Sequence, residues 1–309
     1  MIEAGLIVAR FLHYVAVTTL AGASLFPLYA CGVVESGAPS RWRQGTLLTA
    51  AIIALLSGLV WFVFSVANMS GTLTDVTDPE VVWSVLHDTG FGTVWAVRMT
   101  LTVVALGLIL LHFASPPRKA RGGLAVPALA GALLISLAGV GHTQVQDGFA
   151  GLVHVVSDAA HLLAAGAWLG GLVALALILV AYNRDRGAKG DLDRILMRFS
   201  GMGYVAVATL VGSGLVNSWY LVGTVTSLLT TQYGQLLLAK LALFAGMLLL
   251  AVINRFWLVP STSKSAAEGG GSPVWTVRLR NHVLGEQFLG LMILVIVSVL
   301  GTMAPAIGQ

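Results

Sequence analysis

Eight long apolar segments alternate with short polar ones along this chain, and no other feature constrains its fold as strongly. A helix needs about 20 apolar residues to cross the hydrocarbon core of a bilayer, and each segment approaches or exceeds that length. The apolar runs are continuous, whereas the strands of a transmembrane barrel alternate apolar with polar residues. The sequence therefore predicts an all-α integral membrane protein with eight transmembrane helices, near residues 5–30, 46–67, 92–113, 123–142, 150–181, 199–222, 234–258 and 284–304.

The low charge content agrees with this prediction. Charged residues make up 10% of the chain, compared with about 25% in soluble domains. Cys31 is the single cysteine, which excludes an internal disulfide and a cluster of thiolate metal ligands. No basic segment precedes the first apolar run, so we expect this run to be a membrane span and not a cleaved signal peptide.

Lysine and arginine residues gather in alternate connections between the apolar segments. Positively charged connections stay on the cytoplasmic side of a membrane, so both termini and the acidic connection over residues 72–88 are predicted to lie on the outer side. The isoelectric point near 9.5 reflects this topology and does not indicate nucleic-acid binding. Fourteen of the 17 basic residues follow the rule: Arg41, Arg43, Arg118, Lys119, Arg121, Arg184, Arg186, Lys189, Arg194, Arg198, Arg255, Lys264, Arg278 and Arg280.

Three short motifs recur in the same order in the two halves of the chain. This recurrence predicts a tandem repeat, with a first four-helix membrane unit over residues 1–145 and a second over residues 146–309. Because each unit has an even number of spans, both units have the same orientation in the membrane. The motifs are His13 to Gly22 and His161 to Gly170, SGLV at 57–60 and at 213–216, and Phe91-Gly92 to Arg98 and Tyr233-Gly234 to Lys240.

Polar residues in the fifth span share one helical face. His154, Asp158 and His161 follow one another at a spacing of four and then three residues, which places them on one side of a helix. The two histidines are separated by about 10.5 Å along the axis, so one metal ion cannot easily take both. They are either successive positions on a path for a metal ion or members of separate metal sites whose other ligands come from other helices.

Two more histidines, His13 and His142, lie in the outer half of the predicted membrane region. Imidazole suits copper, zinc and iron, and it is the usual axial ligand of haem. We therefore predict that His13, His142, His154 and His161 are metal ligands, with Asp158 as a hydrogen-bond acceptor that orients them. Interhelical hydrogen bonding is the alternative explanation for each of them taken singly.

The remaining polar and sulfur-containing residues have less specific interpretations. Arg10, Arg98 and Lys240 extend to the outer interface or, for Arg98 and Lys240, bind a cofactor. His87 lies in the acidic outer connection, and the inner half offers few soft ligands apart from four methionines. We interpret His112 and His282 as interfacial residues and Met69 and Met303 as packing residues. The four inner methionines are Met99, Met202, Met247 and Met292.

The chain resembles the CopD/PcoD copper-resistance membrane proteins over almost its whole length. The resemblance lies in the pattern His154-x3-Asp158-x2-His161 with Trp168-Leu-Gly-Gly, in Tyr233-Gly-Gln-Leu-Leu-Leu-Ala-Lys240, and in Arg10-Phe-Leu-His13. It implies a multi-pass protein of the bacterial inner membrane that moves copper from the periplasm to the cytoplasm, with both termini periplasmic. It also implies a separate periplasmic CopC-like copper-binding partner, and copper as the bound ion.

The repeated unit is also similar to the four-helix HemJ-type membrane proteins, which bind haem b. That similarity implies a redox protein, such as a periplasmic copper reductase, in which His13 and His161 are axial ligands and Arg98 and Lys240 pair with propionates. A membrane anchor for a copper chaperone is a third hypothesis. The first of the three describes a transporter and not an enzyme.

Overall fold

The computed structural model describes residues 1–31, 41–114, 124–140, 148–184, 189–261 and 273–308, and these residues form helices without any strand. The all-helical prediction is therefore confirmed for them. The long helices are α1 (Ile2–Phe26), α2 (Arg41–Ser70), α4 (Gly90–Ala114), α5 (Ala125–Ile135), α6 (Gly148–Ala165), α7 (Gly171–Arg184), α8 (Lys189–Val222), α10 (Gln232–Ile253) and α12 (Pro273–Leu300). Shorter elements are α3 (Pro79–Asp88), α9 (Val225–Thr230), the 3-10 turns η3 (Thr74–Thr77), η5 (Ser136–Val140) and η9 (Ala306–Gly308), and the π-helical turns η1 (Pro27–Cys31), η7 (Gly166–Gly170) and η8 (Asn254–Leu258).

Seven of the eight predicted spans are long and apolar enough to cross a membrane in the part of the chain that the structure describes. The remaining one, predicted over residues 123–142, is a shorter apolar helix at Ala125–Ala138. The structure does not describe residues 115–123 and 141–147 on its two sides, so the predicted count of eight spans stays a prediction. The seven spans are Ile2–Cys31, Arg43–Ser70, Gly90–His112, Gly148–Ala181, Leu192–Val222, Gln232–Ser261 and Trp275–Leu300.

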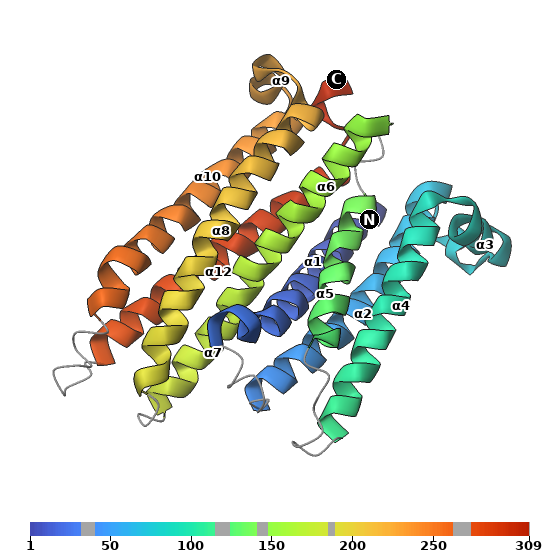
Figure 1. The fold of residues 1–309 in the computed structure, drawn as a ribbon. Helices are drawn as coiled ribbons and strands as arrows, with labels where there is room; N and C mark the ends of the chain where they lie inside the picture. The colour runs from blue at the N-terminus through green and yellow to red at the C-terminus, as the bar shows by residue number, and fades with distance from the viewer. Residues whose placement is uncertain (32–40, 115–123, 141–147, 185–188, 262–272, 309) are drawn as a thin grey trace.

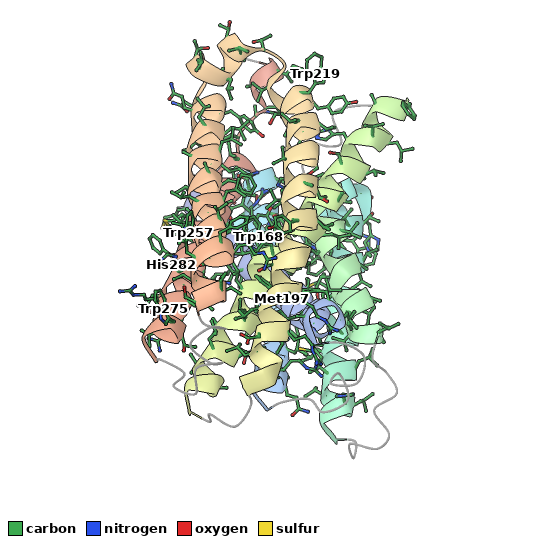
Figure 2. All side chains as sticks on the ribbon, turned by 60° about the vertical axis from the view of Figure 1, so that its left-hand side comes forward. Trp168, Met197, Trp219, Trp257, Trp275 and His282 are labelled. Carbon is green, nitrogen blue, oxygen red and sulfur yellow. The ribbon has the colours of Figure 1, made fainter. Side chains whose placement is uncertain are left out.

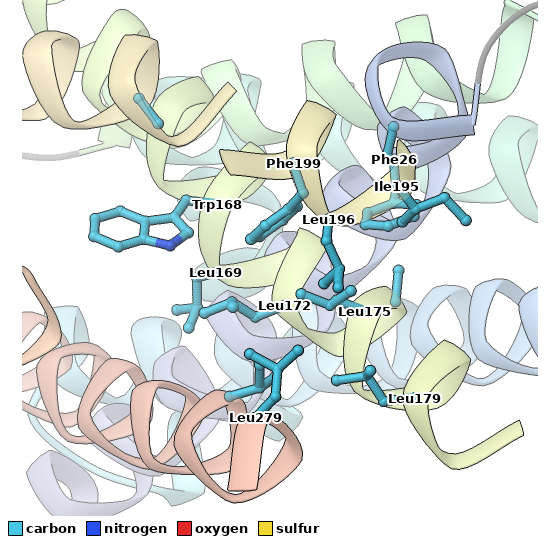
Figure 3. Close-up of a cluster of buried hydrophobic side chains, with 14 of the residues drawn as sticks. Phe26, Trp168, Leu169, Leu172, Leu175, Leu179, Ile195, Leu196, Phe199 and Leu279 are labelled. Carbon is cyan, nitrogen blue, oxygen red and sulfur yellow. The ribbon is translucent and has the colours of Figure 1, made fainter. Parts of the chain in front are cut away.

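The helices run side by side in one bundle, and α1 lies at its centre (Figure 1). It packs against α2, α5, α7 and α12, so it contacts helices from both halves of the chain. The largest apolar cluster lies beside it, where Phe26 from α1, Phe199 from α8 and leucines from α7 interlock (Figure 3). Because the middle of the bundle is packed with apolar side chains, each buried polar group must find its partner within the protein.

Two glycines allow α1 to approach the fifth span closely. A methyl group added at Gly22 would collide with the backbone of Gly170 and of Gly166. A methyl group at Gly170 would in turn collide with the carbonyl oxygen of Thr18 and with the backbone of Gly22. Small residues of this kind allow helices in membranes to pack backbone against backbone. The two matching glycines of the predicted repeat therefore lie against each other at the contact between the two halves.

Replacing Gly170 with alanine should destabilise the protein by about 1–3 kcal/mol, the usual cost of overpacking. The added methyl group forces α1 and η7 apart, because the atoms it meets belong to the backbone of α1 and cannot move away as a flexible side chain could. Thermal unfolding of the detergent-purified protein measures the effect. Gly107→Ala is the matched control, because a methyl group there meets nothing within 4 Å. Equal melting temperatures for the two variants would contradict this account of the contact.

The same local structure precedes α4 and α10. The hydroxyl of Thr89 accepts a hydrogen bond from the Gly92 nitrogen at 3.0 Å, and that of Thr231 accepts one from the Gly234 nitrogen, also at 3.0 Å. Each threonine thus satisfies a backbone N–H at the start of its helix. A methyl group on Gly92 or on Gly234 would collide with a carbonyl oxygen of the preceding short helix. The aromatic-glycine motif therefore has the same structural role before both helices.

The short helices, the chain termini and two tryptophans mark the two ends of the bundle. The acidic helix α3 and the short helix α9 lie toward the same end as both chain termini (Figure 1). Trp219 is exposed near this end of the bundle, and the partly buried Trp275 lies toward the other end (Figure 2). Tryptophan prefers the two interfaces of a membrane, so their positions fit a bundle that crosses a bilayer.

Candidate functional site

His13 is fully buried on α1 and faces α2. Its Nδ1 lies 3.1 Å from the hydroxyl oxygen of Ser57, and its ring meets the edge of the Trp61 ring at a centroid distance of 5.5 Å. The Nε2 atom is also buried and has no hydrogen-bond partner. A buried polar atom without a partner is uncommon in folded proteins and calls for an explanation.

The hydrogen bonds of Ser57 determine which nitrogen of His13 carries the proton. A serine hydroxyl has one hydrogen to donate, and that of Ser57 goes to the carbonyl oxygen of Ile53 at 2.5 Å. The hydroxyl oxygen must then accept from His13, so the hydrogen of the imidazole resides on Nδ1. The lone pair of Nε2 is left available as a metal ligand, and Ser57 holds the ring in place.

The second half of the chain contains the same arrangement. His161 on α6 lies 3.0 Å through Nδ1 from the hydroxyl oxygen of Ser213, which donates to the carbonyl oxygen of Thr209 at 2.5 Å. The same reasoning assigns the hydrogen to Nδ1 of His161. Both serines belong to the SGLV motifs, so the sequence contained a signal for them as repeated residues, although not as partners of the histidines.

Two arginines surround Trp61 beside His13. The guanidinium carbon of Arg98 lies 4.8 Å from the centroid of the indole ring, and that of Arg10 lies 5.3 Å from it. Arg10 donates to the carbonyl oxygen of Gly301 at 2.6 Å and to the hydroxyl of Tyr14 at 2.9 Å. Arg98 is 2% exposed, so the alternative prediction that it extends to the outer interface is wrong.

No carboxylate in the described part of the chain pairs with Arg10 or Arg98. Buried nitrogens of both side chains, Nε of Arg10 and Nη2 of Arg98, also lack a hydrogen-bond partner. A charged side chain costs about 2.5–3.5 kcal/mol at the centre of a membrane helix, and cation–π contacts offset only part of this cost. This corner of the protein therefore carries excess positive charge next to a free imidazole nitrogen.

The second half balances its charge. Asp158 accepts a hydrogen bond from the Asn217 side chain at 3.1 Å and attracts Lys240 on α10. In the predicted repeat, Asp158 occupies the position of Arg10, three residues before the histidine, and Lys240 occupies that of Arg98. The two halves thus place an imidazole and a cation in the same relation, but only the second half adds a carboxylate.

The other predicted ligands are dispersed. His154 is buried and stacks on Tyr220 with ring centroids 4.9 Å apart. His87, which is not in the predicted ligand set, is exposed and stacks on Trp83. His142 lies outside the described residues. Among the residues that the structure describes, no three His, Cys, Asp or Glu side chains gather into one metal site. This dispersion fits separate positions better than one shared site.

The methionines differ from expectation in one respect. Met99, grouped with the inner methionines in the sequence analysis, instead lies beside His13, where both side chains approach Gly58. The depth of a residue in a tilted bundle depends on helix packing, which the position in the chain does not give. Met303 packs in an apolar cluster as predicted, and Met69 is exposed.

A buried polar cluster that sequence reasoning did not select lies between η8, α12 and η7. Glu286 is 2% exposed and accepts a hydrogen bond from the Asn254 side chain at 2.5 Å, and Trp168 also contacts it. The Gln287 side chain donates to the carbonyl oxygen of Leu169 at 2.7 Å. A carboxyl group within a predicted span was the available signal, because such residues are functional candidates by default.

The comparisons with known proteins agree on one family. The N-terminal domain of copper resistance protein D-like proteins matches residues 1–152, and copper resistance protein D matches residues 193–300. The chain is 34% identical over 306 residues to "Copper resistance protein D" of Pseudomonas syringae pv. tomato, covering 97% of this chain and 96% of that one. It is 29% identical over 300 residues to "Inner membrane protein YebZ" of Escherichia coli, covering 97% and 98%.

A third relative is longer. "Copper transport protein CutJ" of Bacillus subtilis is 30% identical over 254 residues, which cover 79% of this chain and 45% of that protein. No solved structure matches the chain. The apolar helices and these relatives together indicate a multi-pass protein of the bacterial inner membrane. The chain belongs to the copper resistance protein D family.

Proposed function

We propose that this protein transports copper from the periplasm to the cytoplasm and that its outer histidines are successive ligands. The observation that carries the proposal is the buried Nε2 atom of His13, which has no partner and is positioned by the Ser57 hydrogen bond. A neutral imidazole nitrogen is a good copper ligand. Two relatives are named for copper resistance and copper transport, which supports copper as the cargo.

The proposed architecture is two four-helix units, residues 1–145 and 146–309, with eight transmembrane helices and both termini in the periplasm. The paired His–Ser hydrogen bonds and the paired threonine caps before α4 and α10 support the repeat. The distribution of basic residues supports the orientation. Under this orientation His13 and His161 lie in the outer half of the membrane region.

A path for copper requires several weak positions, because an ion that is held tightly at one position does not leave. His13, His142, His154 and His161 are the proposed outer positions. Glu286 with Asn254 is the proposed inner one, since it is a buried carboxyl group that contacts Trp168. A periplasmic CopC-like protein is the proposed donor of copper, and the membrane potential supplies about 2.3 kcal/mol per unit charge at 100 mV.

Copper uptake into sealed proteoliposomes tests this proposal. Vesicles that contain the purified protein and a copper-sensitive dye in their lumen should accumulate copper faster than protein-free vesicles, and an inward-negative potential should increase the rate. Copper that binds to the protein without reaching the dye would overturn transport and favour the membrane-anchor hypothesis. The same vesicles with zinc provide the control for leakage.

A second candidate function, a haem-b redox protein that reduces periplasmic copper, rests on the unpaired arginines. A free imidazole nitrogen beside two guanidiniums without carboxylate partners would suit a haem, which His13 would hold through its imidazole and Arg98 through its charge. His161 and Lys240 would hold the equivalent groups in the second half, where Asp158 already attracts Lys240. Asp158 is therefore a further cofactor-binding candidate in this second function.

A reduced-minus-oxidised absorption spectrum separates the two functions. Transport of copper alone predicts a featureless difference spectrum for protein that is expressed with ample haem. The redox function predicts sharp b-type bands at near-stoichiometric occupancy, and these bands should weaken in a His161→Ala variant that keeps His13. Bands of unchanged intensity in that variant would exclude His161 as an axial ligand.

A further inference from the structure

The surroundings of Gly58 bring a thioether next to the free face of His13. A methyl group added at Gly58 would collide with the terminal methyl of Met99, and it would lie 3.0 Å from the Met99 sulfur and 3.3 Å from Cε1 of His13. Cε1 is bonded to Nε2, the atom without a partner. The sulfur and the imidazole edge therefore flank the same small space, which exists because residue 58 has no side chain.

We propose that His13 Nε2 and Met99 Sδ together form a site that is selective for Cu(I). Thioether sulfur is a soft ligand that selects Cu(I), and imidazole binds this ion as well. Cu(I) accepts low coordination numbers, so two protein ligands are sufficient. This inference rests on the proposed copper transport and adds the second ligand and the oxidation state.

The charges around the site point to the same ion. Arg98 and Arg10 both lie over Trp61, whose ring also meets His13. Their guanidiniums repel any cation at His13, and Coulomb repulsion is proportional to the charge of the ion. A divalent ion such as Cu(II) or Zn(II) thus meets twice the repulsion that Cu(I) meets. Soft ligands and positive surroundings both favour the monovalent ion.

The second half of the chain lacks this combination. Met99 follows Arg98, whereas the residue that follows Lys240 is Leu241, which is 46% exposed. The space at Gly214 touches Cε1 of His161 at 3.9 Å and no sulfur atom. Asp158 adds a hard carboxylate near that histidine. The Cu(I) site is therefore a property of the first half, and leucine is the natural replacement with which to test it.

The test compares Met99→Leu with Met247→Leu, both of which preserve side-chain volume closely. Met247 is the matched control because it is a buried methionine in the core cluster beside α7 and α8, away from His13. Cu(I) affinity is measured anaerobically on the purified protein by competition with a chromogenic Cu(I) chelator. We expect Met99→Leu to lower the affinity at least about tenfold, because loss of a residue that only orients a metal ligand already costs about 10–100-fold, and Met247→Leu to leave it unchanged.

Selenomethionine gives a structural readout. The chain has 8 methionines, and only a ligating one places selenium in the first coordination sphere. X-ray absorption at the copper edge of the selenomethionine-labelled Cu(I) complex should show a copper–selenium distance. This signal should persist in Met247→Leu and disappear in Met99→Leu.

The outcomes distinguish this inference from the proposed function. One outcome rejects Met99 as a ligand and keeps the histidine site. In it, His13→Ala loses Cu(I), Met99→Leu keeps wild-type affinity, and the labelled wild-type protein shows no copper–selenium distance. If His13→Ala also binds Cu(I) like the wild type, the proposed function loses the observation that carries it. Loss of affinity and of the selenium signal in Met99→Leu alone, with Met247→Leu intact, confirms the site.

Discussion

Replacing His13 with alanine should reduce copper uptake into proteoliposomes at least about tenfold, because loss of a residue that only orients a metal ligand already costs about 10–100-fold. The substitution removes the one buried imidazole nitrogen on α1 that has no partner, and alanine offers no other ligand at that depth. The hydroxyl of Ser57 retains its bond to the Ile53 carbonyl, so no new unsatisfied donor arises. The fold should therefore survive, and thermal unfolding checks that it does.

His112→Ala is the matched control for His13→Ala. His112 ends the predicted third span and is interpreted as an interfacial residue, so its loss should leave uptake unchanged. Ser57→Ala is an intermediate case, since it keeps the imidazole of His13 but removes the hydrogen bond that orients this ring. We expect a smaller loss of uptake for Ser57→Ala than for His13→Ala. Equal uptake by His13→Ala and the wild type would remove His13 from the copper path.

Replacing Asp158 with alanine should destabilise the protein by about 1–3 kcal/mol, the cost of leaving a hydrogen-bonding group inside the protein without its partner. Lys240 would keep its charge within the bundle without the carboxylate that attracts it, and the Asn217 side chain would lose its acceptor. The expected result is a large fall in the melting temperature of the detergent-purified protein. The effect should exceed that of any surface substitution.

The double variant Asp158→Ala with Lys240→Met should recover much of this loss. Methionine keeps the approximate length of the lysine side chain and removes its charge, so no cation is left without its carboxylate. The difference between the double variant and the sum of the single variants measures the interaction directly. If the two effects simply add, Asp158 and Lys240 are not coupled, and the charge balance assigned to the second half is wrong.

The histidines show where sequence reasoning succeeds and where it stops. His13 and His161 were recognised because a polar residue in an apolar helix is conspicuous, and because each precedes a glycine by nine residues. Their partners Ser57 and Ser213 lie on other helices. The interhelical rotation that brings a serine to Nδ1 depends on side-chain packing along both helices, and no local pattern encodes it.

Charge shows the same division. In the sequence, Arg10, Arg98, Asp158 and Lys240 are all charged residues within predicted membrane helices, and each is equally unfavourable there. Only packing reveals that Asp158 and Lys240 attract each other, while Arg10 and Arg98 share one tryptophan without a carboxylate. Met99 is a related case, since the sequence placed it among the methionines of the inner half although its sulfur lies beside His13.

The helical membrane fold and the resemblance to the copper resistance protein D family could be predicted from the sequence, because the length of an apolar segment and the spacing of a motif are properties of the chain itself. The sequence also identified the histidines and the buried cations. The tertiary structure alone decided which nitrogen of His13 is free, which cations are unpaired, and which methionine reaches the histidine. These properties depend on contacts between helices that are distant in the chain, and the close approach at Gly22, Gly58 and Gly170 sets those contacts.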